Sequence, residues 1–244
     1  MAKTVSTPTA AAESLRLRPR ILWLQKPWRL SRQNFVRLPY IFVKRLFDIL
    51  FAVIGCVLLV PIAAVVKIAY LLDGDRHPIF YAQPRIGKNG KNFKMYKFRS
   101  MVWDADEKLA QLLKTKKYRV QWDSYQKIDN DPRITKIGDI IRNTSIDEMP
   151  QFINLLKGEM SLIGPRPVVP GELKSHKVHW RYIRQYNLVR PGISGYWATN
   201  GRSNISYDDR VKMELFYVDN YGFSLDAKIF FQTFASVLKR DGAK

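Results

Sequence analysis

Cysteine is almost absent from this chain, and histidine is scarce. The 244 residues include one cysteine, Cys56, and three histidines, His77, His176 and His179. A disulfide framework and a cysteine-rich metal site are therefore excluded, and we expect the histidines to be surface or structural residues. A single cysteine inside an apolar run also indicates a reduced protein that faces the cytoplasm.

Acidic residues are also in short supply. The chain has 41 Lys and Arg against 21 Asp and Glu, which gives a formal net charge of +20. Such an excess attracts nucleic acid, anionic lipid headgroups or phosphorylated substrates. No nucleic-acid-binding motif accompanies it, so we expect no nucleic-acid partner and assign the charge to membrane lipids and phosphate groups. A cationic, membrane-anchored binding or scaffold protein without catalytic activity is the alternative.

Charge is missing altogether from residues 49–66, a run of eighteen residues. That length approaches the roughly 20 apolar residues of a membrane span. Pro61 lies within the run and favours a kink. Residues 1–45 carry ten Lys and Arg against Glu13 alone, and Lys67 follows the run. Because basic flanks stay cytoplasmic, we predict a helix that enters the membrane, bends at Pro61 and returns. An ordinary kinked transmembrane helix is the alternative.

The remaining pattern predicts an α+β fold that is mostly helical. We expect a basic N-terminal extension over 1–40, partly disordered or interfacial, a re-entrant membrane helix over 41–73, and a cytosolic domain over 74–244. Two aromatic-rich runs around a Gly/Asn loop predict a β-hairpin over 79–98. Periodicity and breakers predict further helices over 103–126, 151–157, 171–187 and 226–240.

Two adjacent acids, Asp147 and Glu148, have both a structural and a chemical interpretation. Ser145 and Glu148 have the spacing of a capping box, and acids in a first helical turn complement the helix dipole. Pro150 weakens that interpretation, because a helix capped at Ser145 would need the amide hydrogen that proline lacks. We therefore predict irregular geometry here. An ionised carboxylate among arginines can attack phosphorus, while a neighbouring acid assists proton movement or binds a metal.

Basic residues cluster at turns made rigid by proline or glycine. Singly, each is more often a solvated surface charge, but guanidinium groups also grip phosphate and offset the charge that develops during its transfer. The predicted substrate-phosphate-binding residues are Lys97, Arg99, Arg133, Arg142, Arg166 and Arg202.

The order of these motifs resembles the monotopic phosphoglycosyl transferases, the bacterial sugar transferase family. The matching motifs are 97–101 (KFRSM), 131–133 (DPR), 145–151 around the acidic pair, and 164–167 (GPRP). By this resemblance, Asp147 is the nucleophile that forms a covalent phosphosugar intermediate and Glu148 is its partner acid. Lys44, Arg45 and Asp48 then begin the re-entrant helix, which breaks at Pro61.

The resemblance also implies the reaction. Hexose 1-phosphate passes from a UDP-hexose to undecaprenyl phosphate with release of UMP, by ping-pong kinetics, to start an exopolysaccharide or O-antigen unit. Mg²⁺ would be held by Asp147 and Glu148, at the cytoplasmic face of the bacterial inner membrane. The motif 190–197 favours galactose as donor sugar, with glucose second. Ala198 stands where these relatives usually have Gln, so the identity of the donor sugar stays open. Whether the protein forms a homodimer is open as well.

Overall fold

The computed structural model describes residues 38–125, 128–201 and 205–239. The predicted extension over 1–40 therefore lies almost wholly outside the described residues. From Pro39 onward the chain forms one compact unit. Helices predominate in it, accompanied by two small sheets, one antiparallel and one parallel. This confirms the mostly helical composition that the sequence predicts.

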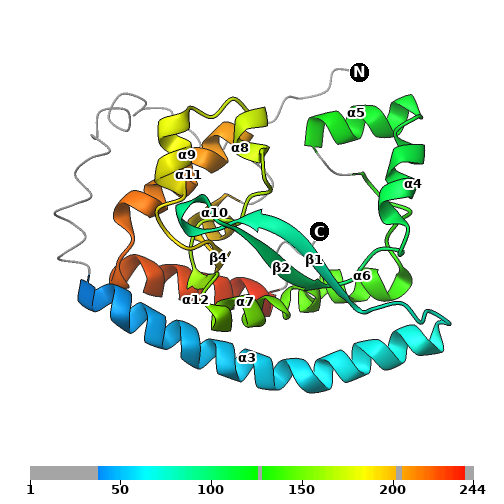
Figure 1. Cartoon of the computed structure of the whole chain (residues 1–244), viewed down its shortest axis with the longest axis horizontal. Coiled ribbons are helices and arrows are strands. Elements are labelled where there is room, and N and C mark those ends of the chain that lie inside the picture. Colours follow the sequence, from blue (N-terminus) through cyan, green and yellow to red (C-terminus); the bar gives the residue numbers. More distant parts are fainter. Residues whose placement is uncertain (1–37, 126–127, 202–204, 240–244) are drawn as a thin grey trace, which may run out of the picture. The chain divides into compact units, whose positions relative to one another are not determined.

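The elements follow one another with short connections, and Figure 1 labels them. The helices are α3 (Leu38–Leu72), α4 (Ala105–Leu112), α5 (Lys116–Tyr125), α6 (Lys136–Asn143), α7 (Gln151–Lys157), α8 (Glu172–Ser175), α9 (Trp180–Tyr186), α10 (Tyr196–Asn200), α11 (Tyr207–Asn220) and α12 (Phe223–Lys239), with 3₁₀ turns η1 (Lys88–Gly90) and η2 (Ile146–Glu148). The strands are β1 (Phe80–Ile86), β2 (Asn92–Phe98), β3 (Ser161–Ile163) and β4 (Gly192–Ser194).

The longest element is α3, with 35 residues. At about 1.5 Å per residue it is about 52 Å long, which exceeds the roughly 30 Å hydrocarbon core of a bilayer. Within the described ranges it is the one helix long and apolar enough to cross a membrane. The helix is continuous through Pro61, and Figure 1 shows it as a smooth curve. Phe42, Val57, Val60 and Val65 are exposed along it. A re-entrant path stays a prediction.

Basic side chains fasten the first half of α3 to the rest of the unit. Lys44 Nζ donates to the carbonyl of Ile163 at 2.9 Å and pairs with Asp226 Oδ2 at 2.5 Å. The two Arg45 Nη atoms donate to carbonyls in the last turn of α7, at 2.8 and 3.0 Å. The Leu155 carbonyl also accepts the Gly158 amide at 3.1 Å, so Arg45 adds to the hydrogen bonds at the end of α7.

Asp48 makes the deepest of these attachments. Its carboxylate is 2% exposed and accepts hydrogen bonds from Ser161 Oγ at 3.1 Å and from the Leu162 amide at 2.8 Å. Both donors belong to β3. Asp48 therefore joins α3 directly to the strand that leads into the Gly-Pro-Arg-Pro turn.

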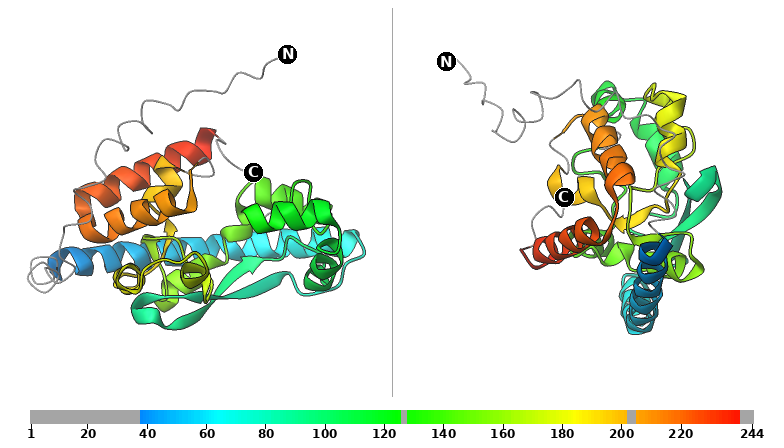
Figure 2. Two further views of the ribbon diagram at one scale, coloured as in Figure 1. Left: turned by 90° about the horizontal axis from the view of Figure 1, so that it is seen from above. Right: turned by 90° about the vertical axis from the view of Figure 1, so that its left-hand side faces the viewer.

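The second half of α3 packs into a hydrophobic cluster. A shared core contains side chains from α3, β2, α6 and the two residues that flank the acidic pair: Leu59, Val66, Tyr70, Phe98, Ile141, Ile146 and Met149. The Tyr70 hydroxyl also donates to the Arg99 carbonyl at 2.6 Å, just after β2. Figures 1 and 2 place α4 and α5 toward the cyan end of α3, and α11 and α12 toward its blue end.

The predicted hairpin is confirmed. Strands β1 and β2 pair antiparallel from Phe80 opposite Phe98 to Ile86 opposite Asn92, around η1. Gly90 has φ +75°, a left-handed conformation that favours glycine. The second sheet pairs β3 with β4 in parallel, so it brings segments from either side of α8 and α9 together.

Some predicted helices are wrong in extent. The helix predicted over 103–126 is two helices, α4 and α5, and that over 171–187 is α8 and α9, with Lys177 at φ +56° between them. The last helix begins at Phe223, ahead of the predicted residue 226. The helix over 151–157 is confirmed as α7. No single breaker separates α4 from α5 in the sequence, which explains the first error.

Candidate active site

The acidic pair lies on η2, a tight turn between α6 and α7. Ser145 precedes it in a left-handed conformation, φ 57° and ψ 15°, and its side chain caps nothing. Pro150 then takes the N-cap position of α7, so this helix starts after the acids. The capping-box interpretation is therefore wrong and the prediction of irregular geometry is confirmed. The short turn leaves both carboxylates at the surface of the core that α3 shares.

A lysine links the two carboxylates. Strand alternation sends Phe98 into the core and Lys97 to the opposite face of β2. There Lys97 Nζ lies 2.9 Å from Glu148 Oε1 and 3.6 Å from Asp147 Oδ2. The Asp147 side chain is 14% exposed and that of Glu148 41%. One cation thus holds both acids, and Asp147 is the more enclosed.

Asn154 fixes the position of Lys97 relative to Asp147 and Glu148. Asn154 on α7 is fully buried, accepts a hydrogen bond from the Tyr96 amide at 2.9 Å and donates to the Lys94 carbonyl at 2.7 Å. These bonds dock α7 onto β2 beside Lys97. Asn154 therefore fixes the position of the backbone that leads into Lys97.

The two acids have opposite electrostatic environments. Burial raises the pKa of Asp147, an effect that Lys97 opposes and the charge on Glu148 reinforces. Burial also acts against the charge on Glu148, but Lys97 and Arg166 outweigh it and the pKa of Glu148 is lowered. Pairs of carboxyl groups pushed apart in this way often divide their chemical roles. The pKa of Asp147 thus lies above its ordinary value and that of Glu148 below its own.

A pocket opens beside the pair. It is lined by residues of the hairpin, η2, α7, the Gly-Pro-Arg-Pro turn, β4, α10 and α11, among them Arg85, Lys97, Glu148, Gln151, Arg166, Ser194, Gly195, Trp197, Ala198 and Glu214. Asp147 does not line it, but its carboxylate contacts Lys97, which does. The pocket therefore contains Glu148 and the cations Lys97 and Arg166, and Asp147 lies next to Lys97.

The Gly-Pro-Arg-Pro turn forms one wall. A Cβ on Gly164 would lie 2.5 Å from the Arg190 carbonyl oxygen, so only glycine allows β3 and β4 to approach this closely. The Arg166 amide donates to Glu214 Oε1 at 3.1 Å, and the Tyr186 hydroxyl donates to the Arg166 carbonyl at 2.7 Å. With its backbone held at both ends, Arg166 presents an exposed guanidinium group to the pocket.

Arg142 is the other predicted cation near the pair. It lies exposed in the last turn of α6, and its charge lowers the pKa of Asp147, against the effect of burial. Three of the six predicted phosphate-binding residues therefore lie near the acidic pair: Lys97, Arg142 and Arg166.

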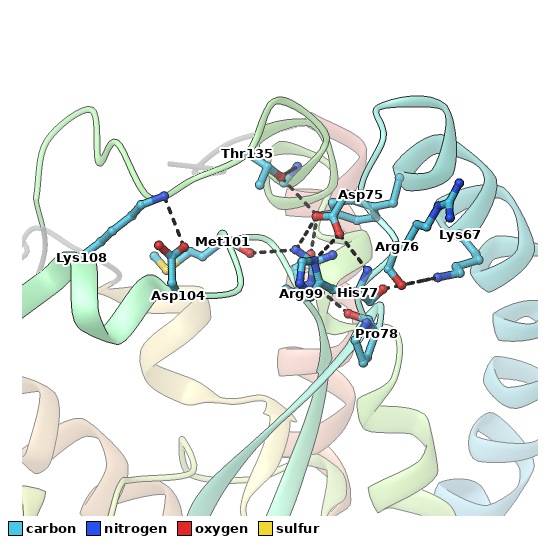
Figure 3. Close-up of polar contacts among 12 residues, drawn as sticks. Lys67, Asp75, Arg76, His77, Pro78, Arg99, Met101, Asp104, Lys108 and Thr135 are labelled. Atoms are coloured by element: carbon cyan, nitrogen blue, oxygen red, sulfur yellow. Dashed lines mark hydrogen bonds and ion pairs between the residues drawn. The ribbon is translucent and has the colours of Figure 1, made fainter.

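The others lie elsewhere. Arg99 is 5% exposed, pairs with Asp75 at 2.8 Å and donates to the Pro78 carbonyl at 2.9 Å, in the cluster that Figure 3 shows. Arg133 is also 5% exposed and pairs with Asp131 at 2.6 Å. Each guanidinium group is paired with a neighbouring carboxylate, Arg99 with Asp75 and Arg133 with Asp131, so the geometry favours a structural role for both. Arg202 falls outside the described residues.

The donor set for a metal is small. No group of three or more His, Cys, Asp or Glu side chains that could hold an ion occurs in the described ranges. Mg²⁺, however, is typically bound through one or two carboxylates together with substrate phosphates and water. Asp147 and Glu148 fit that mode, in which Lys97 would share its carboxylates with the ion.

Trp197 and Glu214 are among the pocket residues that the sequence analysis did not identify as site residues. Glu214 is 1% exposed on α11, among Met213, Leu215 and Phe216. A lone acid within an apolar run is the sequence signal that could have found it, because a buried carboxyl group needs a polar partner. For Trp197 the sequence offers no equivalent signal, since tryptophans commonly pack in cores.

Comparison with known proteins agrees with this geometry. The family model for the bacterial sugar transferases matches residues 39–240, which include α3, the acidic pair and the pocket. The chain belongs to the bacterial sugar transferase family. This confirms the resemblance seen in the motifs, and the match runs from α3 to α12.

Bacterial sugar transferases from several organisms are similar to this chain. A UDP-galactose-lipid carrier transferase from Erwinia amylovora is 43% identical over 83% of this chain and 42% of its own length. An undecaprenyl-phosphate galactose phosphotransferase from Salmonella typhimurium is 41% identical over 83% and 42%. The exopolysaccharide production protein ExoY of Sinorhizobium fredii is 37% identical over 82% and 87%. The chain spans less than half the length of the first two relatives.

Proposed function

We propose that this chain transfers hexose 1-phosphate from a UDP-hexose to undecaprenyl phosphate and releases UMP. The observation that carries the proposal is the position of Asp147. Its carboxylate contacts Lys97, which lines the pocket, while the nearby Ile146 and Met149 pack against the core cluster that includes residues of the apolar helix α3. A nucleotide sugar can reach the carboxylate through the pocket, and a lipid phosphate can reach it along α3.

The first half-reaction uses Asp147 as a nucleophile. Its carboxylate oxygen forms a bond to the β-phosphorus, and the bond from that phosphorus to the bridging oxygen breaks. The electron pair leaves with UMP. The sugar phosphate remains as an acyl phosphate on Asp147. Lys97, Arg142 and Arg166 offset the charge on the transferring group, and the raised pKa of Asp147 suits it to this attack.

The second half-reaction returns the carboxylate. A phosphate oxygen of undecaprenyl phosphate bonds to the same phosphorus, and the bond to Asp147 breaks, which gives a polyprenyl diphosphate sugar and the free enzyme. When bound, Mg²⁺ would supply further positive charge to the phosphates. Glu148, with its lowered pKa, stays ionised to hold Lys97 and to share in binding the ion.

The names of the relatives support the direction of this proposal. Two of them name galactose and one names exopolysaccharide production, so we propose galactose as the preferred donor sugar. Glucose is the alternative donor. We place the reaction at the start of a polysaccharide unit, on the cytoplasmic face of the bacterial inner membrane. The apolar α3 supports the membrane location.

The test is capture of the intermediate. The full chain in lipid nanodiscs receives UDP-galactose labelled in the sugar, without acceptor lipid. We expect one labelled hexose phosphate per active site, localised to Asp147 by peptide mass spectrometry. Asp147→Asn should form none, whereas Asp139→Asn, an exposed acid on α6, should match the wild type. UMP release measured with UDP-galactose, UDP-glucose and UDP-N-acetylgalactosamine then ranks the donors.

Two results would exclude the proposal. Full turnover by Asp147→Asn would exclude Asp147 as the nucleophile. Absence of UMP release from every UDP-sugar, with retained binding of anionic lipid, would instead favour the alternative of a cationic membrane-anchored binding protein.

A further inference from the structure

The pocket contains buried polar atoms that find no hydrogen-bond partner in the described part of the chain. Three of the five such atoms belong to residues that line it: Glu214 Oε2, Trp197 Nε1 and Arg85 Nε. Buried polar groups in proteins are almost always paired, so unpaired ones deserve an explanation. Their grouping in one pocket points to a ligand that supplies the missing partners.

Glu214 is the most deeply placed of the three. Its side chain is 1% exposed, and one carboxyl oxygen already accepts the Arg166 amide. The other oxygen, Oε2, has no donor. The floor next to it is Gly195, where a Cβ would lie 3.9 Å from Glu214 Oε2. Burial raises the pKa of Glu214 to about 7, so near neutral pH the carboxyl group both accepts and donates.

Trp197 offers a single donor. The guanidinium carbons of Arg166 and Arg210 lie 5.5 and 4.8 Å from the ring centroid, within cation–π distance. The ring surface is thus already engaged, and the indole N–H is the part left for a ligand. A nucleobase held by stacking would need a free ring surface. A sugar hydroxyl group, which accepts one hydrogen bond and donates another, matches an indole donor beside a carboxyl group.

The position of the phosphates favours the sugar as well. In the proposed reaction the β-phosphorus lies at Asp147, close to Lys97. The hexose is joined to that phosphorus through one oxygen, so it must lie in the space adjoining Lys97. The pocket that Lys97 lines is such a space, and Glu214 and Trp197 form part of its wall.

We propose that Glu214 and Trp197 bind a hydroxyl group of the donor hexose and so help to select the sugar. The hydroxyl oxygen accepts from Trp197 Nε1, and its hydrogen is donated to Glu214 Oε2. Both residues contact the substrate without taking part in bond making at phosphorus. This inference rests on the proposed function, because it takes a UDP-hexose as the donor.

The test uses near-isosteric variants of the full chain in nanodiscs. Glu214→Gln keeps Oε1, and hence the bond from the Arg166 amide, but changes the atom that meets the hydroxyl group. Trp197→Phe removes the indole N–H. Asp208→Asn on α11 and Trp180→Phe on α9, both exposed, are the matched controls. Thermal unfolding of each variant shows whether its fold is retained.

UMP release is measured with UDP-galactose and with its 3-, 4- and 6-deoxy analogues, and UDP is titrated as an inhibitor without sugar. We expect each site variant to lower kcat/KM for UDP-galactose by about three- to tenfold, the value of one neutral hydrogen bond. One deoxy analogue should react equally with wild type and variants, because it lacks the hydroxyl group concerned. Inhibition by UDP should be unchanged in every variant.

Three outcomes would overturn the inference: an equal loss with every analogue, a matching loss in UDP affinity, or wild-type kcat/KM in both variants. Equal losses would assign the two residues to the architecture of the Arg166 turn, and a loss of UDP affinity would assign them to the nucleotide. If the wild type releases no UMP but binds UDP-galactose more tightly than UDP, with the excess lost in both variants, the proposed function fails and the hydroxyl-binding site stands.

Discussion

Removing the Asp48 carboxylate should release β3 from α3. Asp48→Ala would leave two donors, Ser161 Oγ and the Leu162 amide, without their acceptor in a site where the aspartate is 2% exposed. At about 1.5 kcal/mol for each bond to a charged acceptor, the loss is roughly 3 kcal/mol. For a chain of this size that corresponds to a fall in Tm of roughly 6 to 12 °C.

The assay is thermal unfolding of the purified chain in one detergent, followed by circular dichroism. Val57→Ala is the matched control, because Val57 lies on the same helix with its side chain exposed. Asp48→Asn keeps an acceptor oxygen and should lose less than half as much as the alanine variant. Asp48→Ala and Ser161→Ala should be non-additive, since the two share one bond.

The reasoning would be refuted if Asp48→Ala unfolded at the same temperature as Val57→Ala. It would fail equally if the Asp48 and Ser161 losses simply added, because the carboxylate would then stabilise the protein by some route other than its bond to β3.

Three further predictions concern charge and packing. Burial acts to raise the pKa of Asp75, but its bonds with Arg99 and His77 lower it to about 2, so its stabilisation is present above about pH 4 and lost as pH falls toward 2. The Tm deficit of Asp75→Asn should therefore shrink over that range. Gly55→Ala should cost about 1 to 3 kcal/mol in a urea titration, since its Cβ would lie 2.2 Å from the Phe152 ring. Lys97→Met should raise the pKa of Asp147 and move the acid limb of UMP release to higher pH.

Each has its own contrary outcome. A deficit in Asp75→Asn that stays constant from pH 4 to pH 2 would show that the carboxylate does not titrate as stated. Wild-type stability in Gly55→Ala would mean that Phe152 moves aside at no cost. Lys94→Met, exposed on the same strand, is the control for Lys97→Met, and identical pH profiles for the two would disconnect Lys97 from Asp147.

Local chemistry in the sequence predicted those parts of the fold that neighbouring residues determine. The hairpin follows from a Gly/Asn loop between aromatic-rich runs, and the irregular turn at the acids follows from the missing amide hydrogen of Pro150. Helix ends set by packing were not predictable in this way. The gap between α4 and α5, for example, contains neither glycine nor proline.

The same distinction holds at the site. Motif order identified the acidic pair, and the structure places Lys97 against both acids. Arg99 and Arg133 share the charge and the turn context of Arg166, yet each is engaged by a carboxylate. Whether an arginine faces a ligand or a buried acid depends on pairings between distant segments, such as Asp75 with Arg99, and a single sequence does not reveal them.

The attachment of α3 at both ends has a mechanical consequence. Lys44 and Asp48 attach its first turns to β3 and α12, while Tyr70 attaches its last turn to the Arg99 carbonyl, just after the strand that carries Lys97. If α3 tilted in a lipid bilayer, Asp147, the nucleophile that we propose, would rotate through the same angle. In the proposed reaction, the structure then fixes the height at which the Asp147 carboxylate meets the lipid phosphate, and we expect the reaction rate to differ between bilayers of different thickness.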